Sequence, residues 1–314
     1  MMRVLITGGG GYIGTVLTNY LLSLGFKITV VDKFLFGNFL KRHKNLKIIK
    51  ADIRDLSKIS FKNIQSIIHL ANISNDPTSL LNPKLSWEVN ALSTKFLIEK
   101  AIKENVKRFI FASSGSVYGI KKENKVTEDL SLLPITDYNK TKMISERILL
   151  SYKDQIELVC IRPATVCGYS PRMRLDVTVN MFVMQALTKR KVTVFGGNQL
   201  RPNITLRDMV RIYEFFLKKK KIKQNIFNAG IENLKVIDIA KKIQKKINCK
   251  IEITKIFDER SYRLDTQKLL NEGFVYKYSI NDAIVELLDN YKKGKLKNKK
   301  IYYNLEVMKS MKNI

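Results

Sequence analysis

The sequence predicts an α/β protein whose main domain is a doubly wound parallel sheet, with a smaller lobe interleaved after it. Two observations carry this prediction. Short apolar runs alternate with amphipathic helical segments through the first half of the chain, as in sheets built from repeated strand–helix–strand units. The first run ends in a glycine-rich turn and the second ends in an acid, Asp32, which is the arrangement of a dinucleotide-binding Rossmann unit.

The glycine turn, Gly8–Gly14, follows the apolar run Arg3–Thr7 and precedes a helical pattern that stops at Gly25. Glycines at these spacings let the backbone approach a pyrophosphate, whose charge is stabilised by the helix N-terminus. Asp32 can accept a hydrogen bond from a ribose 2′-hydroxyl and would repel a 2′-phosphate, so we predict NAD rather than NADP. The residues predicted to hold the cofactor in this unit are Gly8, Gly11, Tyr12, Ile13, Gly14 and Asp32.

Two further apolar runs, Leu46–Lys50 and Ser66–His69, are expected to be parallel strands whose carboxyl ends point into the ligand crevice. Asp52 lies just beyond the first run and could hold the adenine amino group, with Ile53 beside it. His69 ends the second run. Because the strand around it is apolar, we expect a packing role for His69 rather than catalysis.

A strand at Arg108–Ala112, a helix from Asp137 and a strand ending at Pro163 continue the alternation. In that helix Tyr138 and Lys142 are four residues apart and share one face. The pKa of a phenol falls beside an ammonium group, so such a tyrosine can act as a general acid or base near neutral pH. An isolated pair of this kind is usually a surface pair, so the interpretation depends on the site that the rest of the chain builds around it.

The same patterns predict how the chain is divided. Residues 1–167 form the NAD-binding domain, to which 204–228 return, whereas 168–203 and 229–291 form the second lobe and 292–314 a basic tail. Within the lobe we expect a helix around Asn180–Leu187 and short strands at Val192–Phe195 and Lys250–Ile253.

The chain is strongly basic, with 57 Lys and Arg residues against 28 Asp and Glu residues and a formal net charge of +29. Nucleic-acid binding is one interpretation of such a charge. However, the basic residues are mostly lysines scattered along the chain beside many Asn and Ile residues, which indicates a compositional bias. We therefore expect no nucleic-acid partner, although the positive field would attract an anionic small substrate.

The cysteine count and the hydropathy pattern bear on the compartment. The chain has 3 cysteines and no metal-ligand spacing, which favours a reducing, cytoplasmic setting and no metal site. No run of about eighteen apolar residues occurs, so we expect no membrane span. The first strand starts at Arg3 without a signal-peptide pattern before it.

With Gly8–Gly14, Asp32, Ser114, Tyr138 and Lys142 in this order, the chain resembles the extended short-chain dehydrogenase/reductase superfamily. Within it, nearly the whole chain is similar to the NAD-dependent epimerase/dehydratase family, whose members act on nucleotide-diphosphate sugars. The resemblance implies that Tyr138 takes the proton of a sugar hydroxyl while hydride leaves the same carbon for the nicotinamide. It also implies that Lys142 holds the ribose hydroxyls and that Ser114 hydrogen-bonds the reacting oxygen.

The resemblance implies further contacts in both halves of the site. On the cofactor side it adds Leu70, Ala71 and Pro163. On the substrate side, Asn180, Arg201 and Arg260 would meet the diphosphate, and Arg172 and Arg174 could add another anion contact. The implied substrate set is Ser114, Thr165, Asn180, Phe195, Arg201 and Arg260. A homodimer is implied as well, through a four-helix bundle that uses the helix after Asn82 and the Tyr138 helix.

Departures from the family pattern narrow the chemistry. Sugar 4,6-dehydratases carry an Asp-Glu pair straight after the Ser/Thr, where this chain has Gly115 and Ser116. A Ser–Tyr–Lys set with no additional acid or base suffices for hydride transfer at a single carbon. The resemblance therefore favours a nucleotide-sugar 4-epimerase, with a net 4-oxidase or keto-sugar reductase as the alternative. The intact Tyr138–Lys142 pair disfavours a non-catalytic dinucleotide sensor.

Overall fold

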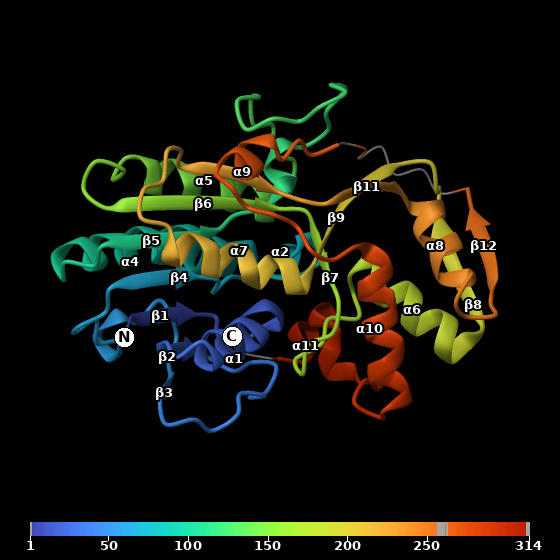
Figure 1. Ribbon diagram of the computed structural model, residues 1–314, viewed down its shortest axis with the longest axis horizontal. Coiled ribbons are helices and arrows are strands. Elements are labelled where there is room, and N and C mark those ends of the chain that lie inside the picture. The colour runs from blue at the N-terminus through green and yellow to red at the C-terminus, as the bar shows by residue number, and fades with distance from the viewer. Residues whose placement is uncertain (1, 256–260, 262, 312–314) are drawn as a thin grey trace.

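A parallel sheet runs through the main domain of the computed structural model, which describes residues 2–255, 261 and 263–311 (Figure 1). Within these residues, seven strands pair in the order β10-β6-β5-β4-β1-β2-β3, and every neighbouring pair is parallel. The order reverses between β1 and β4, which is the topological switch point of a doubly wound sheet, so the predicted fold class is confirmed. The strands are β1 (Arg3–Thr7), β2 (Lys27–Asp32), β3 (Leu46–Lys50), β4 (Ser66–His69), β5 (Arg108–Ala112), β6 (Glu157–Pro163) and β10 (Ile226–Ala229).

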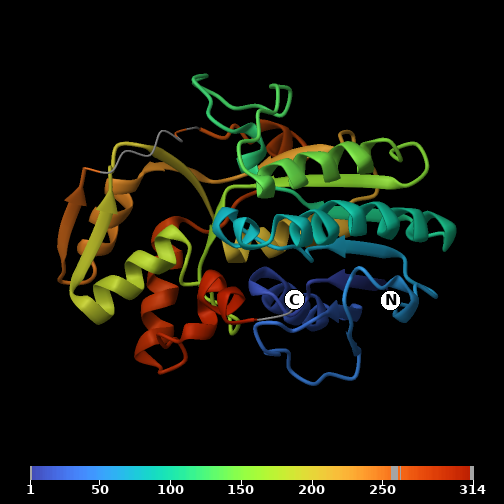
Figure 2. The same ribbon diagram turned by 180° about the vertical axis from the view of Figure 1, so that it is seen from behind.

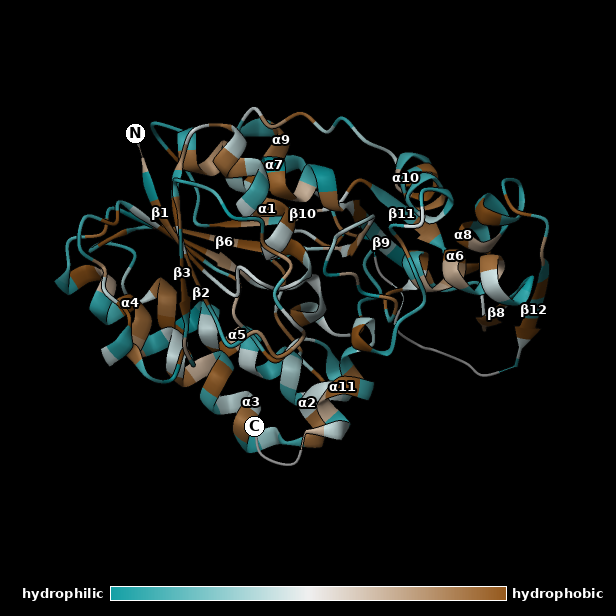
Figure 3. Ribbon diagram, turned by 90° about the horizontal axis from the view of Figure 1, so that it is seen from below, coloured by the Kyte–Doolittle hydropathy of each residue, from teal (hydrophilic) through white to brown (hydrophobic). Residues whose placement is uncertain are grey.

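Helices cover both faces of this sheet (Figure 3). The side chains of β1 alternate between two apolar cores, with Val4 and Ile6 in one and Leu5 in the other. Because both faces of the sheet are covered, the strands consist of almost continuous runs of apolar residues. In the part of the chain that the structure describes, no helix is both long and apolar enough to cross a membrane. One face carries α1 (Tyr12–Ser23) and α7 (Leu206–Lys218), and the other carries α3 (Pro83–Trp87), α4 (Ser93–Lys103) and α5 (Asp137–Leu150).

A π-helical turn, Glu88–Leu92, joins α3 to α4. It presents Asn90 to the loop after β4, where the amide accepts a hydrogen bond from Ile73 N (2.8 Å) and donates one to Ile73 O (3.2 Å). The same amide donates to Thr141 Oγ1 on α5 at 3.0 Å. Asn90 therefore fixes the crevice loop against the helix that carries the predicted Tyr–Lys pair, and π turns are frequent at functional positions of this kind.

The second lobe contains two small sheets. Among the described residues these are a three-stranded sheet, β11-β9-β7, and a two-stranded sheet, β12-β8, whose strands are parallel. Both predicted strands of the lobe are present, whereas β7, β9 and β11 were not predicted. Strand β7 has only 3 residues, β9 contains a proline, and β11 is mostly polar. The new elements are β7 (Thr165–Cys167), α6 (Thr178–Lys189), β8 (Lys191–Phe195), β9 (Leu200–Thr205), β11 (Glu232–Lys235), α8 (Val236–Gln244), β12 (Lys250–Thr254), α9 (Gln267–Asn271) and α10 (Ile280–Lys292).

The segment between β9 and β11 leads back to the main domain. Helix α7 packs against α1, and the hydroxyl of Tyr20 donates a hydrogen bond to Glu214 across that contact (2.5 Å). Strand β10 then pairs with β6 and forms one edge of the large sheet. The chain thus crosses between the two parts more than once, which brings residues distant in sequence to the same cavity.

The C-terminal segment packs against both parts of the chain. After α10 it forms a short 3₁₀ turn (Lys300–Tyr302) and helix α11 (Asn304–Ser310), which lies between the main sheet and the lobe and contacts α2 (Asp76–Leu81) (Figure 2). Tyr302 and Met308 are almost fully buried. Their burial anchors a segment for which the sequence predicted only a basic tail.

Candidate active site

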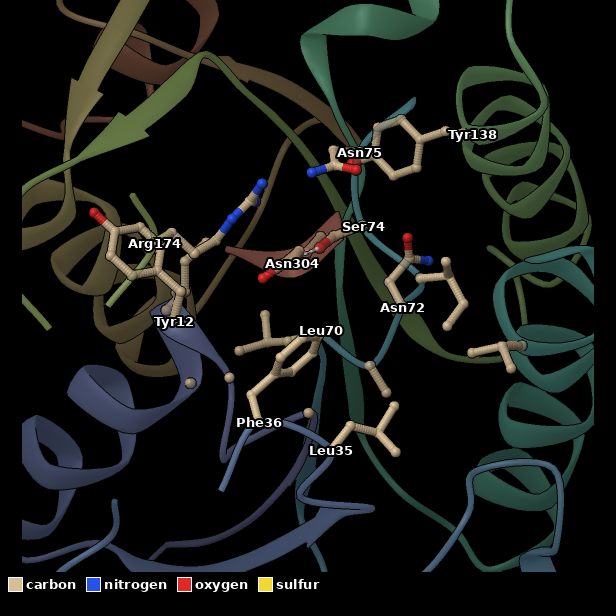
Figure 4. Close-up of a pocket in the computed structure, with 18 of the residues that line it drawn as sticks. Tyr12, Leu35, Phe36, Leu70, Asn72, Ser74, Asn75, Tyr138, Arg174 and Asn304 are labelled. Carbon is tan, nitrogen blue, oxygen red and sulfur yellow. Dashed lines mark hydrogen bonds between the residues drawn. The ribbon is translucent and has the colours of Figure 1, made fainter. Parts of the chain in front are cut away.

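A cavity of about 630 Å³ opens where the carboxyl ends of the central strands meet the second lobe and α11. Ligands of doubly wound sheets bind in this position. The main sheet, α5, the lobe and α11 all contribute side chains to its wall (Figure 4). Every residue predicted to hold the cofactor lines it, and so do Ser114 and Thr165 from the substrate set. The predicted cofactor residues that line it are Gly8, Gly11, Tyr12, Ile13, Gly14, Asp32, Asp52, Ile53, Leu70, Ala71, Tyr138, Lys142 and Pro163.

The glycine turn is compact enough that side chains are excluded from it. Gly8 has a φ of +73°, and a Cβ there would lie 2.5 Å from the backbone nitrogen of Ala71, beyond β4. A Cβ on Gly14 would collide with the carbonyl oxygen of Gly8. No side chain of the described residues caps α1, whose N-cap is Gly11, so its first N–H groups remain available to an anion.

Asp32 stands at the end of β2 beside this turn. Its carboxylate accepts hydrogen bonds from the backbone N–H groups of Gly10 (2.9 Å) and Phe34 (2.6 Å). Burial raises the pKa of the Asp32 carboxyl, and the two N–H donors oppose that rise. A glycine turn, an uncapped helix N-terminus and an acid on the second strand together fit NAD, which they would hold by its pyrophosphate and its adenosine ribose.

Asp52 forms ion pairs on the cavity wall. Its carboxylate lies 3.1 Å from Lys33 Nζ and 2.9 Å from Arg54 Nη2. Partial burial acts to raise the pKa of Asp52, but the hydrogen bonds from Arg54 and Lys33 hold that pKa well below its usual range. The contact with the adenine amino group stays a prediction for a carboxylate that already has two cationic partners.

The predicted reacting groups meet at the other end of the cavity. Ser114 follows β5 and caps a 3₁₀ turn, with its Oγ 3.2 Å from Ser116 N and 2.7 Å from Ser116 Oγ. Tyr138 lies in the first turn of α5 and its ring points into the cavity beside Asn75 (Figure 4). Lys142 lines the same cavity one helical turn later. The structure therefore brings the three predicted catalytic residues into the space that the glycine turn and Asp32 also line.

Lys142 is buried, and its surroundings reduce its affinity for a proton. Its ammonium donates to the carbonyl oxygen of Ala112 (2.5 Å) and lies 4.7 Å from the centroid of the Phe111 ring. Burial lowers the pKa of Lys142 to about 7, against the opposing effect of the nearby Glu146 carboxylate. Lys142 can therefore change its charge near neutral pH.

Glu146 lies one turn after Lys142 and is held by a buried network. It pairs with Arg162 of β6 at 2.7 Å, with both side chains at most 3% exposed, and accepts a hydrogen bond from Ser113. Arg162 also donates to the hydroxyl of Tyr118 (2.8 Å). The network attaches α5, and with it Tyr138 and Lys142, to the sheet beneath the cavity.

His69 has the packing role that we expected. Its ring nitrogens lie 2.6 Å from Thr7 Oγ1 and 2.9 Å from Thr94 Oγ1, and the side chain is fully buried. Burial lowers the pKa of His69 to about 3, so the ring is neutral at physiological pH. Among the described residues, no group of three or more His, Cys, Asp and Glu side chains could hold a metal ion.

Asn180, predicted to meet the substrate diphosphate, is bonded within the protein and does not line the cavity. Its amide accepts a hydrogen bond from Gly168 N (3.0 Å) and donates to the Tyr12 hydroxyl (3.1 Å) and to Arg174 O (2.9 Å). The side chain is buried and does not line the cavity, because it ties the loop before α6 to α1. Thr178, in the first turn of the same helix, lines the cavity instead.

The other predicted groups of the lobe also lie away from this wall. Phe195 ends β8, is 46% exposed as a residue, and does not line the cavity. Arg201 of β9 donates to the carbonyl oxygen of Leu200 (3.2 Å) and is likewise not part of the wall. Arg260 lies outside the described residues. A position carried over along a motif does not determine which way its side chain points. The residues that line the cavity therefore give no support to substrate contacts by Phe195 and Arg201.

Sequence reasoning missed a carboxylate in the cavity. Asp76 begins α2, lines the cavity, and accepts a hydrogen bond from Thr136 Oγ1, whose side chain also caps α5. Asn75 is the N-cap of α2 and accepts from Thr78 N (3.0 Å). The sequence signal was present, since Asn-Asp-Pro after an apolar strand is a helix start at the crevice edge. Tyr138 is therefore not the only titratable group near the reacting end.

Comparison with known proteins places this geometry in a family. Residues 4–230 match the NAD dependent epimerase/dehydratase family. The chain is 29% identical over 269 residues to a UDP-glucose 4-epimerase of Lactobacillus helveticus. The aligned region covers 77% of this chain and 82% of that protein. It is 26% identical to a trifunctional Arabidopsis thaliana protein named for UDP-glucose 4,6-dehydratase, 3,5-epimerase and reductase activities, over 92% of this chain and 47% of that protein.

A solved structure shares the architecture over nearly its full length. The UDP-glucuronic acid 4-epimerase from Bacillus cereus, in complex with UDP-glucuronic acid and NAD, is 27% identical to this chain. The two agree with a TM-score of 0.83, covering 93% of this chain and 99% of that one.

Replacing Glu146 with Gln tests its electrostatic effect on Lys142. The Glu146 carboxylate raises the pKa of Lys142, so its loss should move the alkaline limb of the pH–rate profile to lower pH by about one unit. Because Arg162 loses its buried partner, the free energy of unfolding should fall by about 3–5 kcal/mol. The pH–rate profile and urea unfolding measure the two effects separately.

Glu252→Gln is the matched control, because it removes a surface ion pair with Lys191 (3.0 Å) on β12 and β8. Both readouts should stay within error of the unsubstituted protein. An alkaline limb that does not move in Glu146→Gln would show that Glu146 does not control the charge of Lys142.

Proposed function

We propose that this chain, which belongs to the NAD-dependent epimerase/dehydratase family, epimerises a nucleotide-diphosphate sugar. The proposed reaction proceeds by transient oxidation at C4. The observation that carries the proposal is one cavity lined by the glycine turn and Asp32 at one end and by Ser114, Tyr138 and Lys142 at the other. Next to Ser114 the chain has Gly115 and Ser116, so no carboxylate follows it there. This set supports reversible proton and hydride transfer at a single carbon.

In the proposed mechanism Tyr138 accepts the proton of the C4 hydroxyl as the carbon–hydrogen bond at C4 breaks. When bound, NAD supplies the site that takes the hydride and later gives it back. Ser114 donates a hydrogen bond to the C4 oxygen as its negative charge develops, and Lys142 stabilises the phenolate form of Tyr138. The keto sugar then rotates in the cavity, so that the hydride would return to the opposite face of C4. Tyr138 returns the proton to the oxygen, and the configuration at C4 is inverted.

The part of the cavity wall that the second lobe contributes carries a cationic side chain. Arg174 lines it, paired with Asp176 at 2.9 Å, and Thr178 lies in the first turn of α6. The net charge of +29 adds a long-range field that favours the approach of a diphosphate. We also propose a cytoplasmic location, because Cys160, Cys167 and Cys249 are free and buried.

Turnover of a panel of UDP-, GDP-, CDP- and dTDP-sugars, followed by NMR and by absorbance of the reduced cofactor, tests the proposal. We expect inversion at C4 without net reduced cofactor, whereas stoichiometric reduced cofactor, or its consumption by a keto sugar, would indicate the oxidase or reductase alternative. Tyr138→Phe should lower kcat by about 10²- to 10⁴-fold because the proton acceptor is lost. Tyr152→Phe, a surface tyrosine bonded to Glu99 (2.8 Å), is the matched control.

Solvent deuterium distinguishes chemistry at one carbon from elimination assisted by Asp76. Hydride that leaves C4 and returns to C4 never exchanges with water, so the product formed in D₂O should carry no deuterium on carbon. Deuterium at C3, C5 or C6 would require a base at a neighbouring carbon and would contradict the single-carbon mechanism. Asp76 would then be the first residue to test, since its carboxylate lines the cavity.

We also propose that the protein forms a homodimer through α4 and α5, which pack together on the outer side of the sheet. Leu92 and Phe96, one turn apart at the start of α4, are 49% and 50% exposed. Large apolar side chains exposed together are typical of interaction surfaces.

Phe96→Glu places a charge in that apolar surface and should shift the protein from dimer to monomer in light-scattering measurements at micromolar concentration. Ile253→Glu, at a 60% exposed position on β12, is the matched control and should leave the mass unchanged. A monomeric mass for the unsubstituted protein would refute the proposed dimer.

A further inference from the structure

Arg172 is a buried cation on the cavity wall. It lies in the loop between β7 and α6, and only 2% of the residue is exposed. Within the described residues it forms no ion pair, whereas Arg174, two positions along, is paired with Asp176. A buried charge without a direct ion pair is costly, so an anion bound beside Arg172 would stabilise it.

Neutral groups hold the Arg172 guanidinium in place. It lies 4.0 Å from the centroid of the Phe36 ring and donates to the side-chain oxygen of Asn304 (2.6 Å) and to Met173 O (3.1 Å). Its Nε has no hydrogen-bond partner in the described part of the chain. Burial and the nearby Arg174 together lower the pKa of Arg172 to about 9, although the carboxylates of Asp176 and Asp32 act to raise it.

The loop that carries Arg172 is attached to the N-terminus of α1. Ser170 donates through its hydroxyl to the carbonyl oxygen of Tyr12 (2.9 Å), and the Tyr12 hydroxyl donates to Gly168 O (2.7 Å). These bonds fix the loop beside the uncapped first turn of α1, where Gly11 is the N-cap. Arg172 and the first N–H groups of α1 therefore line neighbouring parts of the same cavity.

We propose that Arg172 binds the pyrophosphate of the dinucleotide, opposite the glycine turn. The N-terminus of α1 would supply N–H donors on one side of the pyrophosphate and the Arg172 guanidinium would supply charge on the other. The nearest acid of the turn, Asp32, is already bonded to Gly10 N and Phe34 N. This inference rests on the dinucleotide part of the proposed function, and it holds whichever sugar is the substrate.

Helix α11 positions Arg172 for this contact. Asn304 accepts from Arg172, donates through its side chain to Ser74 Oγ (3.0 Å), and donates through its backbone N–H to Asp176 (3.3 Å). It thereby joins the loop after β4 to the loop of the second lobe at the cavity (Figure 4). The C-terminal segment would close over the bound cofactor and slow its release.

Arg172→Gln and Asn304→Asp in the full-length protein test the proposal by two different changes. The first removes the charge, and the second places a carboxylate beside it that competes with the pyrophosphate. For each, we expect NAD and ADP-ribose to bind roughly 10- to 100-fold more weakly by calorimetry, as for the loss of a charged hydrogen bond. The affinity for adenosine, which lacks the pyrophosphate, should not change. Arg172→Lys should recover part of the lost affinity because it restores the charge.

Arg42→Gln removes the same charge from an exposed loop and should leave every affinity unchanged. If Arg172→Gln weakened the binding of adenosine as much as that of NAD, the role of Arg172 would be purely structural and the proposal would be overturned. An unchanged affinity for NAD would overturn it as well. If Arg172→Gln weakened the binding of UDP and left the affinity for NAD unchanged, Arg172 would be assigned to the diphosphate of the sugar substrate. That result would also overturn the proposal. Failure of the unsubstituted protein to bind NAD would instead refute the proposed function itself.

Discussion

The buried ion pair between Glu146 and Arg162 is the interaction on which the arrangement of the reacting end depends. It joins α5 to β6 with both charges removed from water, and breaking such a pair costs about 3–5 kcal/mol because it leaves the partner uncompensated. Arg162 is in turn bonded to Tyr118, which donates to Asn228 at the edge of the sheet (2.8 Å). The pair therefore supports both the position of α5 and the charge of Lys142.

The main domain could be predicted because its signals are local. A glycine with positive φ, such as Gly8, and apolar runs of strand length leave their mark within a few residues of sequence. The acid at the end of the second strand and the Tyr138–Lys142 spacing are equally short-range. These features were enough to predict the doubly wound sheet and the cofactor side of the cavity.

The rest of the cavity depends on contacts between distant parts of the chain. Asn304 reaches Ser74 across a sequence separation of 230 residues, and nothing near position 304 indicates such a contact. At Asn180 a motif position suggested a ligand contact, whereas the structure shows the amide bonded to Gly168 and Tyr12. Short-range patterns indicate which residue types are available, whereas tertiary packing decides which of them face the cavity.

The net charge of the chain and the charge of its cavity follow different rules. The excess of lysine is spread over the surface, where water and salt weaken each charge, and it gives only a general attraction for anions. At the cavity, Lys33 and Arg54 are paired with Asp52 and Glu88, and Arg174 is paired with Asp176, so these charges largely cancel. A single buried guanidinium stacked on an aromatic ring can then define where an anion binds, because the low-dielectric surroundings strengthen its field. In the proposed function the cofactor stays bound through a cycle of oxidation and reduction. A local cation would help to retain it, whereas a diffuse surface field, weakened by water and salt, would contribute little.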